Sequence, residues 1–138
     1  MFGYLDFLFL SYAGRIGRGA YWLGLIGLMV LQWIVIWLLL QLAHGSIDQL
    51  GILADGQEHE LPPNVAQDLM IHIGLPLLIV TLLFLYPSFA LATKRWHDRG
   101  KSGWWSLIAL VPIIGGLWYL IELGFLGGDE GANQYGVR

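Results

Sequence analysis

Three stretches of this chain, residues 19–43, 69–93 and 102–121, contain no Asp, Glu, Lys or Arg. About 20 helical residues are enough to cross the hydrocarbon core of a bilayer, which is roughly 30 Å thick. Ionisable side chains are costly in that core, so uninterrupted stretches of this length predict membrane-spanning helices. The composition agrees, since 57% of the 138 residues are hydrophobic and only 12% are charged.

We therefore predict one all-α membrane domain over residues 1–138: an integral bundle of three transmembrane helices plus a short N-terminal interfacial helix. The apolar residues 2–12 are too few to span and are expected to lie at the membrane surface. Proline and glycine in the second and third spans predict kinks. The expected parts are the interfacial segment 2–12, spans at about 20–43, 69–93 and 104–126, an acidic loop 44–68, a basic loop 94–103 and a tail 127–138.

The basic residues predict the orientation. They lie before the first span and after the second, whereas the 44–68 loop has no Lys or Arg. Because cytoplasmic segments carry the excess of Lys and Arg, we expect a multi-pass protein of the bacterial inner membrane with a cytoplasmic N-terminus and an external acidic loop. The start, residues 1–10, has Asp6 and no Lys or Arg, so we expect no cleaved signal peptide.

The third apolar stretch allows two topologies. A full crossing places the tail outside, separated by the bilayer from the basic loop. If Pro112 and the Gly115-Gly116 pair instead turn the chain back as a re-entrant hairpin, the tail and the basic segments meet on one side. We favour the full crossing, because 104–126 is long enough to span and each half alone is too short.

The usual signatures of catalysis and metal binding do not hold in this sequence. Gly100-Lys101-Ser102 resembles the end of a phosphate-binding loop, but Arg95 stands where that motif needs glycine. Adjacent residues such as His97 and Asp98 point about 100° apart on a helix, so they form no dyad by themselves. The Glu58-His59-Glu60 cluster lacks ligand spacing typical of a metal site. We expect no catalytic residues, no metal, no cofactor and no nucleic-acid partner.

Charged and aromatic residues cluster where helices should meet the cytoplasmic headgroups. Basic side chains near an anionic leaflet each gain about 1 kcal/mol, and Trp prefers the interface. These residues are our candidates for contact with lipids, anionic ones in particular, or with a membrane-protein partner or second copy: Arg15, Arg18, Trp22, Lys94, Arg95, His97, Asp98, Arg99, Lys101, Trp104, Trp105 and Asn133. A proton-sensitive pair of His72 and Glu122, both expected on the external side, is a further candidate, against the simpler reading of two interfacial polar groups.

The sequence resembles a bacterial inner-membrane family catalogued as domain of unknown function 805. Three pieces carry the resemblance: Gly14-Arg15 with Arg18 and Tyr21-Trp22, the segment from Arg95 to Trp105, and a late pattern of Pro112, Gly115, Gly131, Asn133, Tyr135 and Gly136. Lys94 stands where an arginine pair is usual in the family. The resemblance implies a bacterial inner-membrane protein and supplies no activity.

Two classes of function remain open. The first is a small inner-membrane protein without assignable catalysis, which is structural, contacts lipid headgroups or is accessory to a membrane partner, with a small-residue face at Gly24 and Gly27 for helix contact. The alternative is a transporter or membrane enzyme with a cytoplasmic-side polar site. That site would need five residues to converge: Arg15, Arg18, Arg95, His97 and Asp98.

Overall fold

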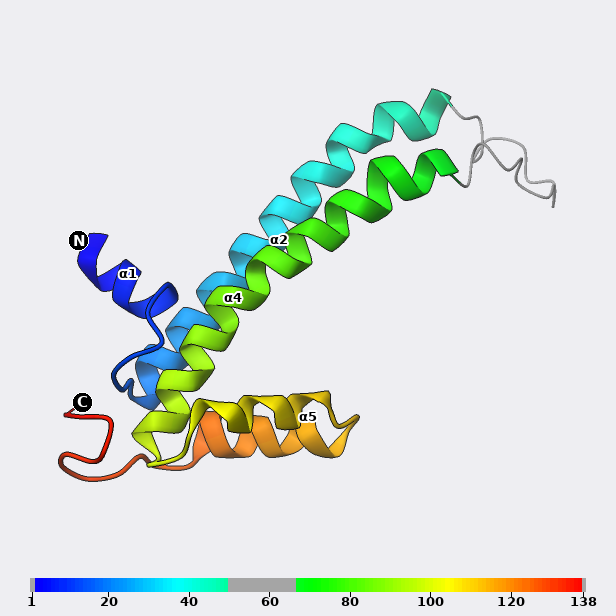
Figure 1. Cartoon of the computed structure of the whole chain (residues 1–138). Helices are drawn as coiled ribbons and strands as arrows, with labels where there is room; N and C mark the ends of the chain where they lie inside the picture. Colours follow the sequence, from blue (N-terminus) through cyan, green and yellow to red (C-terminus); the bar gives the residue numbers. More distant parts are fainter. Residues whose placement is uncertain (1, 50–66, 138) are drawn as a thin grey trace. The chain divides into compact units, whose positions relative to one another are not determined.

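The computed structural model describes residues 2–49 and 67–137, and these residues are helical or irregular, with no strand among them. The predicted all-α fold is confirmed in this part of the chain. The Glu58-His59-Glu60 cluster lies outside the described residues. In chain order the elements are α1 (Phe2–Phe9), α2 (Arg18–Gln49), η1 (Met70–Gly74), α4 (Leu75–Asp98), η2 (Gly103–Leu110), α5 (Ile114–Tyr119) and η3 (Leu120–Phe125) (Figure 1).

Two helical segments are long and apolar enough to cross a membrane, Arg18–Ala43 and Gln67–Asp98, with mean hydropathies of 2.5 and 2.3. The first helix continues to Gln49, so residues 44–49, the start of the predicted loop 44–68, are helical. Polarity marks where a helix leaves hydrocarbon, but it does not end the helix. A proline or another competing backbone partner is needed for that.

A single π-helical turn, η1, precedes α4. The Leu75 N–H donates to the carbonyl of Met70, five residues back, and Pro76, which has no N–H, follows. A proline ring collides with the carbonyl four residues before it in an α-helix, and a π-turn widens the helix at that place. The helix therefore continues through Pro76 without ending.

By residue contacts the chain divides into two compact units: one of Met1–Met29 with Leu85–Arg138, and one of Val30–Phe84. In the described part of the second unit Ala43 is the one buried residue. Large apolar side chains of this unit are exposed, such as Trp33 at 68% and Leu83 at 67%. Apolar surface of this extent is not left to water in a soluble domain, so lipid is its natural solvent.

Residues 103–125 form a hairpin of two helical halves. The sequence favours a kinked span over 104–126 and leaves this hairpin open as the alternative. Figure 1 shows η2 and α5 running antiparallel. At the turn the Ile114 N–H donates to Pro112 O at 2.7 Å and Ile113 adopts φ 63°. A Cβ on Gly115 would lie 1.8 Å from Ile108 O. Proline stops the first half, and glycine alone permits the second half to pack so closely on it.

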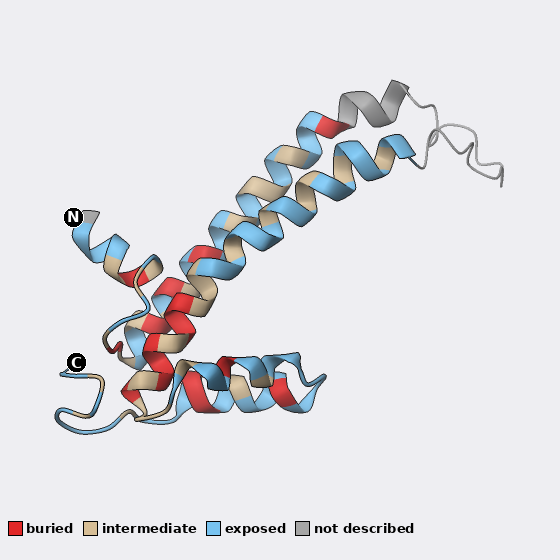
Figure 2. Ribbon diagram, in the orientation of Figure 1, coloured by how far each residue is buried: buried red, intermediate tan, exposed pale blue. Residues whose placement is uncertain are grey.

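The core of the first unit lies where α2 begins and α4 ends (Figure 2). Leu91, Trp96 and Leu123 have no exposed surface. A Cβ on Gly24 of α2 would lie 2.8 Å from Leu91 Cδ2, whereas Gly27 has nothing within 4 Å. Of the predicted small-residue face, Gly24 is therefore used within the chain, and Gly27 is open.

Candidate functional site

Three buried charged side chains meet at the end of α4. Asp98, Arg15 and Arg95 have side chains with no exposed surface. Asp98 Oδ1 accepts hydrogen bonds from Arg15 Nε at 3.2 Å and Nη2 at 3.1 Å, and its Oδ2 accepts one from Arg95 Nη1. Two guanidinium groups thus share one carboxylate, and the excess positive charge requires further acceptors.

Backbone carbonyls of the C-terminal tail supply those acceptors for Arg15. Its Nη1 donates to Gly131 O at 2.6 Å and Gly136 O at 2.9 Å, and its Nη2 donates to Asp129 O at 2.8 Å. The Asp129 N–H donates in turn to Asp98 O at 2.7 Å. A guanidinium has five N–H donors in a fixed fork, and Arg15 uses this fork to bind the tail to the end of α4.

Arg95 makes a similar connection to the second half of the hairpin. Its Nε donates to Leu123 O at 2.8 Å, and its Nη2 donates to Leu126 O. These carbonyls belong to the last turn of η3 and the residue after it, where a helix leaves acceptors without partners. Arg95 therefore caps the hairpin and holds it to α4.

Lys94 holds the N-terminal segment in the same way. Its ammonium donates to Phe7 O at 2.7 Å, Leu8 O at 2.8 Å and Ser11 O. These are carbonyls at the end of α1 (Phe2–Phe9) and just beyond it. An ammonium group has three donors and is attracted by the negative end of the helix dipole, so Lys94 is a C-cap for α1.

His97 lies at the edge of this cluster rather than in it. Its ring stacks on Tyr135 with centroids 3.8 Å apart and planes at 6°, and Nδ1 lies 3.2 Å from Gly14 O. Asn133 Nδ2 donates to His97 O at 2.9 Å and to Asp129 Oδ2 at 2.8 Å. His97 and Asn133 thus connect the tail to α4.

A second ion-pair group involves Glu122. Its carboxylate pairs with Arg99 Nε at 2.6 Å and Lys101 Nζ at 2.6 Å. The Lys101 ammonium also lies 5.5 Å from the Trp96 ring centroid and 5.4 Å from that of Trp105. The sequence predicts Glu122 on the side of the membrane opposite the basic loop. The turn at Pro112 brings the chain back, so Glu122 contacts that loop instead.

The remaining candidates are more dispersed. Arg18 Nη1 donates to Phe125 O at 3.0 Å, and Trp22 Nε1 donates to Gly124 O at 3.1 Å. Trp104 is 78% exposed and Trp105 46% exposed. His72 belongs to the other compact unit, where its Nδ1 lies 2.9 Å from Asp68 O.

The five residues of the alternative polar site are therefore brought together only in part. Arg15, Arg95 and Asp98 converge, whereas Arg18 and His97 have other partners. Among the side chains that the structure describes, in residues 3–43 and 67–137, no group of three His, Cys, Asp or Glu could hold a metal ion. The described cluster provides fixed charge and hydrogen bonds, but no evident nucleophile.

A family model described as "Protein of unknown function (DUF805)" matches residues 9–137, nearly the whole chain. The chain belongs to this family. The DUF805 motifs are the segments that the cluster joins: Gly14-Arg15, the α4 end with Arg95 and Asp98, and the tail with Gly131 and Gly136. These three segments are far apart along the chain and meet only in the folded structure.

The family includes proteins of Escherichia coli strain K12. "Inner membrane protein YhaI" is 39% identical over 69 residues, 46% of this chain and 57% of YhaI. "Inner membrane protein YhaH" is 35% identical over 63 residues, 46% of this chain and 51% of YhaH. The matches span about half the length of these curated relatives. No solved structure matches the chain. With its apolar helices, the chain is a membrane protein of this family.

Sequence reasoning missed three groups of the site. The tail carbonyls of Gly131 and Gly136, the Asp129 backbone and the Tyr135 ring all contact residues near α4. The late Gly131, Asn133, Tyr135 and Gly136 pattern was the available signal. Gly131 and Gly136 have φ of 77° and 102°, a conformation that favours glycine and turns their carbonyls into the site.

Proposed function

We propose that this DUF805 protein is a non-catalytic structural or accessory protein of the bacterial inner membrane. Its buried charges serve to lock three cytoplasmic segments together. The observation that carries the proposal is the fully buried Asp98 between Arg15 and Arg95, whose guanidinium groups also bind backbone carbonyls. Groups occupied in this way stabilise an architecture, because turnover requires donors and acceptors that a substrate can reach.

The same contacts support a topology of two crossings and one re-entrant hairpin. Arg15 precedes α2, Asp98 ends α4, and both bind residues 129–136. A bilayer cannot lie between groups in direct contact, so these segments belong on one side, and the basic residues make that side cytoplasmic.

Cysteine labelling in intact cells tests the topology, because the chain has no cysteine. Single cysteines at Gly56, Ser102 and Asn133 are exposed to a membrane-impermeant thiol reagent before and after permeabilisation. We expect labelling at Gly56 in intact cells, and at Ser102 and Asn133 only after permeabilisation. Labelling of Asn133 in intact cells would restore the three-span topology and contradict the proposal.

Lipid contact in this proposal comes mainly from apolar surface. Lys101 and Arg99 keep only 30% and 18% of their side-chain surface exposed and already pair with Glu122. Trp104, by contrast, is 78% exposed. We therefore expect a small preference of the purified protein for vesicles containing phosphatidylglycerol over pure phosphatidylcholine. A strong, salt-sensitive preference would instead favour an anionic headgroup clamp.

The transporter or enzyme alternative is favoured by one observation, the convergence of Arg15, Arg95 and Asp98. It makes a different prediction for His97. If His97 moves a proton, His97→Ala removes activity in cells while the fold survives, and His97→Phe, which retains a ring to stack on Tyr135, does not rescue it. If stacking is its role, His97→Phe behaves like the natural protein.

A further inference from the structure

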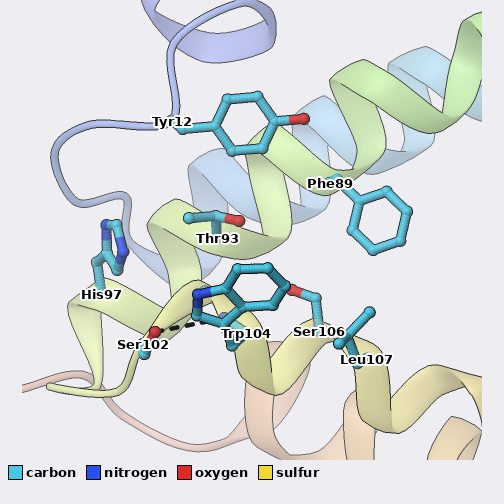
Figure 3. A pocket seen from close by; sticks show the side chains of 9 residues that line it. Tyr12, Phe89, Thr93, His97, Ser102, Trp104, Ser106 and Leu107 are labelled. Carbon is cyan, nitrogen blue, oxygen red and sulfur yellow. Dashed lines mark hydrogen bonds between the residues drawn. The ribbon is translucent and has the colours of Figure 1, made fainter.

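A cavity of about 460 Å³ lies between α4 and η2, apart from the buried charges (Figure 3). This volume is within the range of small-molecule sites, about 300–1,000 Å³. One wall is the α4 stripe of Phe89, Thr93 and His97, which are spaced four residues apart and so share a helix face. Ser102 and Leu107 are among the residues of the opposite wall.

The polarity of both walls changes in the same direction. Near the turn that joins α4 to η2 lie His97 and Ser102, whose Oγ accepts a hydrogen bond from the Trp104 N–H (Figure 3). Away from the turn lie Phe89 on α4 and Leu107 on η2, with Ser106 beside Leu107. The site thus has a polar end and a more apolar end, and none of its lining residues is Asp, Glu, Lys or Arg.

The shape of the site depends on one close contact. A Cβ on Gly103 would lie 2.5 Å from Thr93 Cγ2, so glycine lets η2 start against α4 and then diverge from it. Burial, together with the neighbouring Tyr86 phenol, raises the pKa of Tyr12, which also lines the site. The Tyr12 hydroxyl donates a hydrogen bond to Tyr86 O at 3.1 Å.

We infer that this cavity binds one membrane amphiphile, with its polar end at His97 and Ser102 and its hydrocarbon chain between Phe89 and Leu107. The inference rests on the proposed topology, in which α4 ends at the membrane surface. The polar end of the site then lies at headgroup depth and the apolar end at acyl-chain depth. A membrane lipid and a free single-chain amphiphile share this chemistry, and the mass of the bound molecule distinguishes them.

Photolabelling of the unmodified chain is the first test. The purified protein is placed in phosphatidylethanolamine and phosphatidylglycerol vesicles with a trace of phospholipid that carries a diazirine at the chain end or next to the headgroup. We expect the chain-end probe to label Phe89 or Leu107 and the headgroup probe to label His97 or Ser102, above the labelling of other exposed positions. Even labelling along α2 and α4, or the reverse order, would overturn the inference.

Native mass spectrometry of the detergent-extracted protein is the second test. We expect one retained lipid-sized adduct per chain. Phe89→Trp and Leu107→Trp fill the cavity from opposite walls and should lower the retained fraction about tenfold, the scale expected for one overpacked side chain. The matched controls Leu85→Trp and Leu110→Trp lie on the same two elements and do not line the cavity, so they should retain the adduct.

The outcomes separate the two proposals. Loss of the adduct in both cavity variants, with unchanged thermal unfolding, supports the site. An adduct that persists in both, or that is absent from the natural protein, overturns it. Cysteine labelling tests the topology independently of the cavity. The two-crossing topology can therefore be supported while the cavity proposal is rejected. Labelling at Asn133 in intact cells would instead contradict the topology itself.

Discussion

Arg15 and Asp98 are 83 residues apart in the chain and meet through two hydrogen bonds, in a place where neither side chain has exposed surface. One of these residues precedes the first long helix, and the other ends the second. Their contact makes both helix ends and the C-terminal tail parts of one buried network.

Replacing Asp98 by Asn should destabilise the protein severely. The substitution keeps the shape of the side chain but leaves the buried guanidinium groups of Arg15 and Arg95 without their carboxylate. Breaking a buried ion pair on one side costs about 3–5 kcal/mol. Denaturant unfolding in detergent micelles measures this, with Glu130→Gln, an exposed acid, as the control. A loss no greater than that of the control would show that the network does not stabilise the fold.

Arg95→Lys should destabilise the fold strongly and Arg99→Lys only slightly, although both substitutions preserve charge. Arg95 uses its fork for Asp98 and for two carbonyls while fully buried, and an ammonium cannot reproduce that geometry. Arg99 is partly exposed and its pair with Glu122 tolerates a point charge. We expect a loss of about 2 kcal/mol or more for Arg95→Lys, on the scale of a charged hydrogen bond, and under about 1 kcal/mol for Arg99→Lys. Equal effects would mean that only positive charge matters.

Gly115→Ala should open the hairpin, and Gly116→Ala should not. The new methyl at position 115 would collide with Ile108 O, whereas nothing lies within 4 Å of a Cβ at Gly116. Overpacking typically costs about 1–3 kcal/mol. Pulsed electron–electron resonance between spin labels at Leu107 and Leu117 would follow the two halves. A longer, broader distance distribution in Gly115→Ala alone is expected, and identical distributions in both variants would be inconsistent with the hairpin.

Gly27→Ala should raise the thermal stability of the protein, and Gly24→Ala should not. Alanine in a helix interior gains roughly 0.5–1 kcal/mol over glycine. At Gly27 that gain is unopposed within the chain, but at Gly24 the methyl meets Leu91 Cδ2. We expect thermal unfolding to rise for Gly27→Ala and to stay level or fall for Gly24→Ala. If Gly27→Ala instead dissociates a second copy or a co-purifying partner, then Gly27 serves a contact between chains.

The long helices were predictable from sequence because their length and lack of charge are local properties. The sequence leaves the hairpin open but favours a full crossing, because a count of apolar residues over 104–126 cannot show that Gly115 contacts the backbone of Ile108. The residue types of the candidate site could be predicted from the sequence, but their arrangement in space could not. The sequence predicts that Arg15 and Arg95 face headgroups, but both turn inward to share Asp98. Their other acceptors are backbone carbonyls distant in sequence, at Gly131 and Gly136 for Arg15 and at Leu123 for Arg95.

The groups of this network become available in a fixed order during synthesis of the chain. Arg15 leaves the ribosome long before its acceptors at Asp98, Gly131 and Gly136 exist, and Lys94 must emerge before α1 can be capped. During synthesis the N-terminal segment therefore carries an unneutralised guanidinium until translation reaches the last residues of the tail. The cluster can therefore close only after the chain has been synthesised through Gly136, and a product stopped before that point would leave Arg15 without these tail acceptors.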